Sequence, residues 1–154
     1  MNYSYQGRHP PPQLAAMEAQ SNDLYDDEQE WLVDSGANSH ITNNLENLTI
    51  QQPFEGNDMV AVGNGSGLKI DNVGSTLLHS SNSSSDFHLK NVLHCPNASA
   101  NILSIQLFFV DNDCHFILFS SHFFVKDNRT KAILLEGKSE NGLYPLQFQG
   151  NSQI

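Results

Sequence analysis

The residues with the clearest chemical potential lie in the stretch WLVDSGANSHIT, residues 31–42. Three apolar residues lead directly into Asp34, and Ser35 and Gly36 follow it. A carboxylate at the end of an apolar strand can lie at the surface of a cleft, where glycine leaves room for backbone amides and serine offers a hydrogen bond. This arrangement suits an acid that activates water. Asp-Ser-Gly is also a common turn tripeptide, so these three letters alone leave a simple strand-end turn open.

The full stretch is more specific than the tripeptide. WLVDSGA, which begins at Trp31, resembles the active-site motif of retroviral-type (retropepsin-like) aspartic proteases, and DSGANSHIT resembles the protease region of Copia-type retrotransposon Pol polyproteins. In that family a glycine-containing flap hairpin follows the catalytic strand, and an apolar segment then leads into a short helix. Residues 59–75, MVAVGNGSGLKIDNVGS, and residues 88–109, HLKNVLHCPNASANILSIQLFF, occupy these places in order. The resemblance covers Trp31 to Leu146.

The resemblance implies that Asp34 is catalytic and that Ser35, Gly36 and Ala37 support it. Aspartic proteolysis needs two carboxylates that share one proton, because two like charges a few ångströms apart cannot both ionise. The chain contains one Asp-Ser/Thr-Gly motif, so an active enzyme requires a homodimer with Asp34 from each subunit facing across the two-fold axis. In the family the hydroxyl residue of the motif makes cross-subunit hydrogen bonds, a role that falls to Ser35. For His40 we expect a structural hydrogen bond rather than a catalytic step.

A glycine-rich segment after the motif is expected to form the flap. Alternating apolar residues on either side of it predict two strands, and its glycines allow positive φ angles and the mobility that a closing lid needs. An ordinary glycine-rich hairpin is the alternative. The residues assigned to the flap and to substrate binding are Val62, Gly63, Asn64, Gly65, Ser66 and Gly67.

Short apolar or alternating segments, punctuated by Gly, Asn, Asp and Ser, predict a mainly β domain from Trp31 onward. The polar stretch 80–86 is expected to be a loop, and residues 126–131, KDNRTK, to be a hairpin turn. One helix is expected from Asn101, since NILSIQLFFVDND begins with a capping-type residue and carries apolar residues at helical spacing. The expected strands are 31–34, 58–62, 68–73, 75–79, 87–92, 115–119, 123–126 and 132–135.

These elements divide the chain into three parts. Residues 1–29 contain three consecutive prolines and the acidic run DLYDDEQE with few apolar residues, which predicts a disordered linker or tail. Residues 30–126 are expected to form the barrel that carries the protease site. Residues 127–154 are expected to begin with a β-hairpin extension. Within them EGKSENGLYPL, residues 136–146, resembles the start of the segment that joins protease to integrase in Copia-type polyproteins. Whether the residues after Phe119 belong to the barrel is left open.

Composition narrows the classes of partner. Acidic residues outnumber Lys and Arg 17 to 7 in the 154 residues, the net charge is −10, and no basic cluster is present, so direct nucleic-acid binding is not expected. No apolar run approaches the length of a membrane span and no secretory signal is recognised, so we expect a cytoplasmic protein, or one inside virus-like particles. The two cysteines, Cys95 and Cys114, are expected to be packed thiols.

Two patterns that suggest a cofactor site lack the geometry or spacing that such a site needs. A zinc site built from His94-Cys95 and Cys114-His115 is disfavoured, because adjacent residues of a strand point in opposite directions. VGNGSG lacks the spacing and the following helix of a nucleotide-binding loop. No metal or other cofactor is therefore expected.

Taken together, the sequence predicts a mainly β fold: a small closed or partly open retropepsin-like β-barrel with one short α-helix and a disordered N-terminal tail. The predicted function is that of an aspartic endopeptidase from a Copia-like retrotransposon polyprotein, active as a homodimer on its own precursor. The alternative is a catalytically silent β-barrel that serves as an interaction or assembly module in a truncated or domesticated element, since a fold can outlive its activity.

Overall fold

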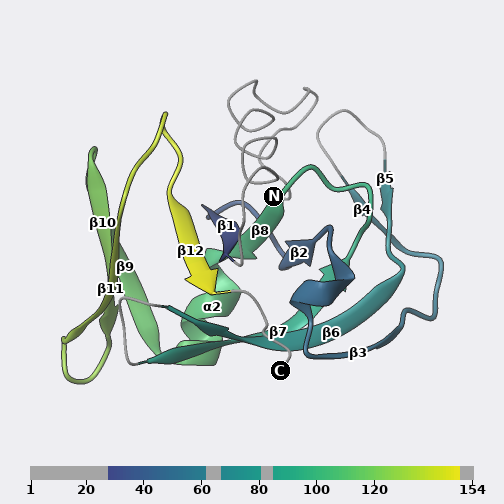
Figure 1. Ribbon diagram of the computed structural model, residues 1–154, viewed down its shortest axis with the longest axis horizontal. Coiled ribbons are helices and arrows are strands. Elements are labelled where there is room, and N and C mark those ends of the chain that lie inside the picture. Colours follow the sequence, from purple (N-terminus) through teal and green to yellow (C-terminus); the bar gives the residue numbers. More distant parts are fainter. Residues whose placement is uncertain (1–27, 62–66, 81–84, 150–154) are drawn as a thin grey trace.

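The computed structural model describes residues 28–61, 67–80 and 85–149, which form a mainly β domain around a closed six-stranded barrel (Figure 1). A single α-helix occurs among the described residues. The predicted mainly β fold, a closed barrel with one short α-helix, is thereby confirmed. The expected tail, residues 1–29, lies outside the described residues except for its last two, which begin the first strand.

Hydrogen bonding around the barrel follows the order β12, β1, β8, β2, β7 and β6, and it returns to β12 through the pair Gln149 and His79. A further strand, β3 (Ile50–Pro53), pairs with the first half of β6. Closure leaves few unpaired strand edges in this part of the molecule. The barrel strands are β1 (Glu28–Asp34), β2 (Ile41–Thr42), β6 (Asn72–His79), β7 (Asp86–His94), β8 (Asn101–Ser104) and β12 (Pro145–Gln149).

The sequence of β7 explains how one long strand follows the barrel wall. Phe87 and Leu89 are buried and their neighbours exposed, as an alternating strand requires. Asn91 then adopts a positive φ of 57°, opposite a register shift between Gly74 and Thr76 of β6. An extra residue of this kind bends a strand and moves the buried set to the other parity, so that Val92 is buried in turn.

The predicted helix begins later than the sequence suggested. Residues 101–104 are not helical: they form β8, which runs parallel to β1 with Trp31 opposite Asn101 and Asp34 opposite Ser104. The helix α2 spans Ile105–Asn112, and its N-cap is Ser104 rather than Asn101. The start predicted at Asn101 was wrong because strand pairing on both sides of β8 outweighs the local helical spacing of its apolar residues.

Two smaller sheets flank the barrel on opposite sides in Figure 1. The hairpin of β4 (Met59–Ala61) and β5 (Gly67–Lys69) lies on one side. The sheet on the other side contains β9 (Cys114–Leu118), β10 (His122–Asp127) and β11 (Ile133–Lys138). A short 3-10 helix, η1 (Leu45–Asn47), precedes β3.

The predicted turn at residues 126–131 is confirmed. It joins β10 to β11, and the Oδ1 atom of Asp127 accepts hydrogen bonds from the backbone N–H groups of Arg129 (2.8 Å) and Thr130 (2.9 Å). The expected loop at 80–86 lies largely outside the described residues.

The C-terminal strand answers the question that the sequence left open after Phe119. β12 pairs with β1 over five residue pairs, from Glu28 opposite Gln149 to Leu32 opposite Pro145. The barrel therefore draws strands from both sides of the boundary that the sequence placed at 126/127. Strands β2, β3, β8 and β12 were absent from the sequence prediction.

Two clusters of buried side chains hold these layers together. The larger one fills the space between barrel, helix and three-stranded sheet, with Trp31, Phe87, Phe108 and Phe123 all fully buried. The smaller one lies at the end of the barrel where β1 terminates, and it is formed by Leu32, Ala37, Ile41, Ile70, Cys95, Ala98 and Ile102.

Both cysteines are buried and unbridged, as predicted. Burial raises the pKa of Cys95 and of Cys114 to about 12, so both thiols stay protonated near neutral pH. In the described part of the chain, no helix has the length and apolar character to cross a membrane.

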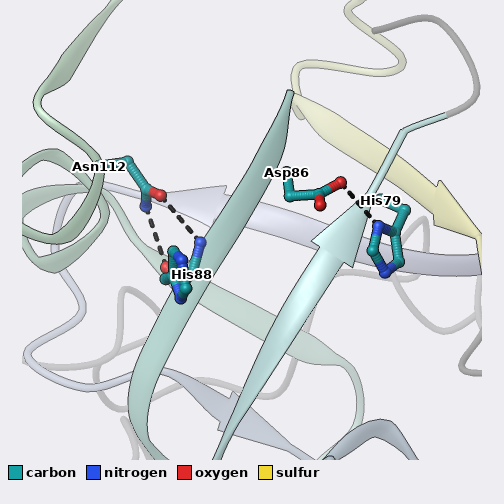
Figure 2. A network of polar contacts seen from close by, with 4 residues as sticks. All are labelled: His79, Asp86, His88 and Asn112. Carbon is teal, nitrogen blue, oxygen red and sulfur yellow. Dashed lines mark hydrogen bonds and ion pairs between the residues drawn. The ribbon is translucent and has the colours of Figure 1, made fainter. Parts of the chain in front are cut away.

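Two sets of polar side-chain contacts involve β7, and their contributions to stability can be compared (Figure 2). The side chain of Asn112 accepts from the backbone N–H of His88 (2.8 Å) and donates to its carbonyl (2.9 Å), which fastens the end of α2 to the strand. His79 and Asp86 form a contact of 2.7 Å, but both side chains are about half exposed.

We expect Asn112→Ala to lower the free energy of unfolding by about 1 to 2 kcal/mol, because two backbone groups lose their partner. The control His79→Ala removes a solvent-exposed pair and should cost less than about 0.5 kcal/mol. Urea denaturation of both variants checks the difference. Equal losses in the two variants would show that the Asn112 contacts stabilise the fold no more than an exposed surface pair does.

Candidate active site

The site begins where β1 ends. Asp34 is the last residue of that strand and lies opposite Ser104 on the parallel strand β8. Its Oδ1 atom accepts a hydrogen bond from the backbone N–H of Gly36 (2.8 Å), and its carbonyl accepts one from Ala37 (3.4 Å). The chain thus turns sharply directly after the carboxylate, as Asp-Ser-Gly sequences favour. The carboxylate is held while it remains partly exposed.

Ala37 anchors this turn in the protein interior. Its side chain is buried in the smaller apolar cluster, and its carbonyl accepts a hydrogen bond of 2.8 Å from the hydroxyl of Ser104. The same hydroxyl caps α2 by accepting from the N–H of Leu107 (3.4 Å). One serine therefore connects the turn, the strand beside it and the helix.

His40 lies behind the turn and is fully buried. Its Nδ1 atom accepts a hydrogen bond from the backbone N–H of Ser104 (3.0 Å), so the ring is neutral and its proton is on Nε2. Burial lowers the pKa of His40 to about 4, which keeps the ring neutral near pH 7. The structural hydrogen bond expected for His40 is confirmed.

A cavity of about 370 Å³ opens between the loop after Asp34 and the β4–β5 hairpin. Most of its walls are apolar, and Asp58 is the one charged residue among them. Several of the residues that line it could not be predicted from the sequence, since Phe54 is a lone aromatic in a polar stretch and Leu93 is one of many strand residues. The cavity is lined by Ala37, Asn38, Ser39, Ile41, Phe54, Asp58, Met59, Val60, Ala61, Ile70 and Leu93.

The hairpin expected to act as a flap is present at this cavity. β4 and β5 pair in antiparallel register, with Val60 opposite Leu68 and Ala61 opposite Gly67. A Cβ atom on Gly67 would lie 2.7 Å from the sulfur and 2.9 Å from the Cβ atom of Met59, so any larger residue here would have to displace Met59. The assigned tip residues 62–66 lie outside the described part of the chain.

The predicted site residues therefore fall into two groups. Asp34, Ser35, Gly36 and Ala37 form one turn, and Gly67 lies on the hairpin. Ala37 lines the cavity together with the hairpin strand β4, whereas Asp34 lies just before the lining loop. The end of the turn and the hairpin thus line the same cavity.

The family described as "Pol polyprotein, beta-barrel domain" matches residues 31–114 of this chain. The chain belongs to this family. The matched segment contains the Asp34 turn, the hairpin and five of the six barrel strands, while the Pol β-barrel domain seen here takes its sixth strand, β12, from beyond the match.

Two relatives support the same assignment. Over 114 residues the chain is 40% identical to "Retrovirus-related Pol polyprotein from transposon RE1" and, equally, to the corresponding polyprotein from transposon RE2, both of Arabidopsis thaliana. The aligned part is 74% of this chain and 8% of each relative, so the chain spans less than a tenth of the length of these relatives. No solved structure matches the chain.

Proposed function

We propose that this Pol β-barrel domain is a retropepsin-like aspartic endopeptidase that acts as a homodimer on the retrotransposon polyprotein to which it belongs. The observation that carries the proposal is the position of Asp34. It lies at the end of a barrel strand, its carboxylate accepts from Gly36 N–H, and the cavity beneath the β4–β5 hairpin starts three residues later. The likeness to "Retrovirus-related" Pol polyproteins supports the retrotransposon polyprotein setting of this proposal.

The chemistry follows from pairing two copies of this turn. One ionised Asp34 removes a proton from a water molecule, and the protonated Asp34 of the second subunit donates a hydrogen bond to the scissile carbonyl. The two carboxylates then titrate as a pair. The reaction needs no metal or other cofactor. Gly36 contributes by holding the carboxylate close to the backbone, as its contact of 2.8 Å supports, and the Ser35 hydroxyl is assigned to hydrogen bonds with the second subunit.

The cavity favours an extended peptide with apolar side chains as substrate. Its walls include Phe54, Ile70 and Leu93, which bury apolar surface but offer no cationic group for an acidic side chain. The hairpin above it has the two-stranded form through which a lid can bind a peptide backbone, and closing would exclude water. We assign Val62, Gly63, Asn64, Gly65, Ser66 and Gly67 to this closing segment.

We place the enzyme in the cytoplasm or in virus-like particles assembled from the same polyprotein. Its partners are a second copy of itself and the uncut precursor, and its acidic composition, 17 acids to 7 Lys and Arg, argues against nucleic acid as a direct partner.

A dimeric enzyme predicts a characteristic dependence on protein concentration. We expect the rate of precursor cleavage per milligram of protein to rise with concentration and then to level off once dimers predominate. The assay follows cleavage of a fusion between the domain and its polyprotein neighbours over a thousandfold dilution series, beside sedimentation of the same samples. A specific activity that stays constant through the range in which sedimentation shows dissociation contradicts the proposal.

A further inference from the structure

His40 is a fully buried polar residue whose two ring nitrogens are treated differently by the structure. Nδ1 accepts from the backbone N–H of Ser104 (3.0 Å), whereas Nε2–H has no hydrogen-bond partner within the described residues. A buried donor without a partner costs about 1 to 3 kcal/mol relative to an apolar side chain of the same shape. Packing alone would therefore favour leucine at this position. The presence of histidine must have another explanation.

The contacts of His40 lead directly to the turn that carries Asp34. Ser104, whose N–H His40 accepts, is the strand partner of Asp34 and donates its hydroxyl to the carbonyl of Ala37 (2.8 Å). Ala37 closes the turn by donating to the carbonyl of Asp34 (3.4 Å), and within that turn Gly36 N–H reaches the Asp34 carboxylate. An unbroken series of hydrogen bonds joins the imidazole to the catalytic residue.

The backbone of His40 adds a second connection, to the substrate cavity. Its carbonyl accepts from the N–H of Leu93 (2.9 Å), and Leu93 lines the cavity beside Ile41. His40 thus contacts the carboxylate turn through its ring, by way of Ser104, and the cavity wall through its backbone carbonyl.

We propose that His40 is a positioning residue for Asp34, which acts through Ser104 to fix the turn of residues 34–37. The neutral imidazole aligns the Ser104 backbone, and the Ser104 hydroxyl then holds the Ala37 carbonyl. This inference rests on the proposed protease function for its catalytic consequence, while the positioning itself is a property of the fold.

The catalytic test compares two replacements of the same ring. His40→Leu keeps an apolar shape and removes the acceptor, whereas His40→Asn places an amide oxygen near the position of Nδ1. We expect kcat for precursor cleavage to fall about tenfold to a hundredfold in His40→Leu with KM within about twofold, and to recover to within about threefold of wild type in His40→Asn. His88→Leu, an exposed histidine on β7, is the control and should leave both constants unchanged.

A second measurement reads the positioning without any cleavage. Amide hydrogen exchange at Gly36 and Ala37 should rise at least about tenfold in His40→Leu and stay near wild type in His40→Asn. Ser104→Ala, which keeps the backbone N–H and removes the hydroxyl, should raise exchange at the same two amides. This variant keeps the test available if His40→Leu does not fold.

The outcomes separate the two proposals. Faster amide exchange at Gly36 and Ala37 in His40→Leu and Ser104→Ala supports the positioning role. If the wild-type protein at the same time cuts no precursor, the protease proposal is refuted while the positioning role stands. Unchanged exchange in both variants, or a kcat that falls equally in His40→Leu and His40→Asn, overturns the positioning role whether or not the wild type cuts.

Discussion

For the proposed protease, we expect the Asp34→Asn variant to lose precursor cleavage by at least about 10³-fold in kcat/KM while it keeps the fold. Asparagine has the shape of aspartate and its side-chain oxygen can still accept from Gly36 N–H, so the turn at the end of β1 is preserved. It cannot ionise, however, and a pair of such residues has neither a base to activate water nor a shared proton. The loss therefore appears in the chemical step.

The matched control for this variant is Asp86→Asn. Asp86 is an exposed carboxylate on β7 whose partner is His79, so its neutralisation changes the net charge by the same amount at a site outside the barrel end that carries Asp34. The two variants are compared with wild type by cleavage of the fusion precursor and by thermal unfolding. Cleavage by folded Asp34→Asn at more than about a tenth of the wild-type rate would rule out Asp34 as the catalytic acid.

We expect acidification from pH 6.5 to pH 4 to lower the free energy of unfolding by about 3 kcal/mol through His40. The folded-state pKa of His40 is about 4 because of burial, whereas the unfolded-state pKa is near 6.5. The unfolded chain therefore takes up the proton first as the pH falls. The stabilisation is complete above pH 6.5 and is lost progressively as the pH approaches 4.

Denaturant titrations at half-unit pH steps measure this loss. The variant His40→Asn supplies an acceptor for Ser104 N–H but does not titrate. Between pH 6.5 and pH 4 its free energy of unfolding should therefore fall by about 3 kcal/mol less than that of wild type. The same dependence in wild type and variant would show that the pH sensitivity arises from other groups. In the proposed aspartic protease, one carboxylate must be protonated for activity, and we expect the loss of stability through His40 to limit how far that activity extends into acid.

Local features of this domain were predictable from its sequence. The turn after Asp34 follows from short-range chemistry, because Asp, Ser and Gly favour the same bend that the Gly36 N–H contact closes. The β4–β5 hairpin and the turn at 126–131 likewise depend on glycines and polar residues next to alternating apolar ones. In each case the deciding interactions join residues that are close in the chain.

Long-range pairing decided what the sequence did not predict. Residues 101–104 have helical spacing, yet they become β8 because β1 and β2 supply partners on both sides. β12 closes the barrel by pairing with β1, which lies more than a hundred residues earlier in the chain. No local sequence pattern predicts that contact. The cavity walls at Phe54 and Leu93 also come together only through the closed barrel.

The most direct test of the account is a mixing experiment between wild type and Asp34→Asn at constant total protein. If each active site contains one Asp34 from each subunit, cleavage of the precursor should fall with the square of the wild-type fraction, to about one quarter in an equal mixture of freely exchanging subunits. A rate that falls in simple proportion, to about one half, would show that one subunit is sufficient and would contradict the shared site.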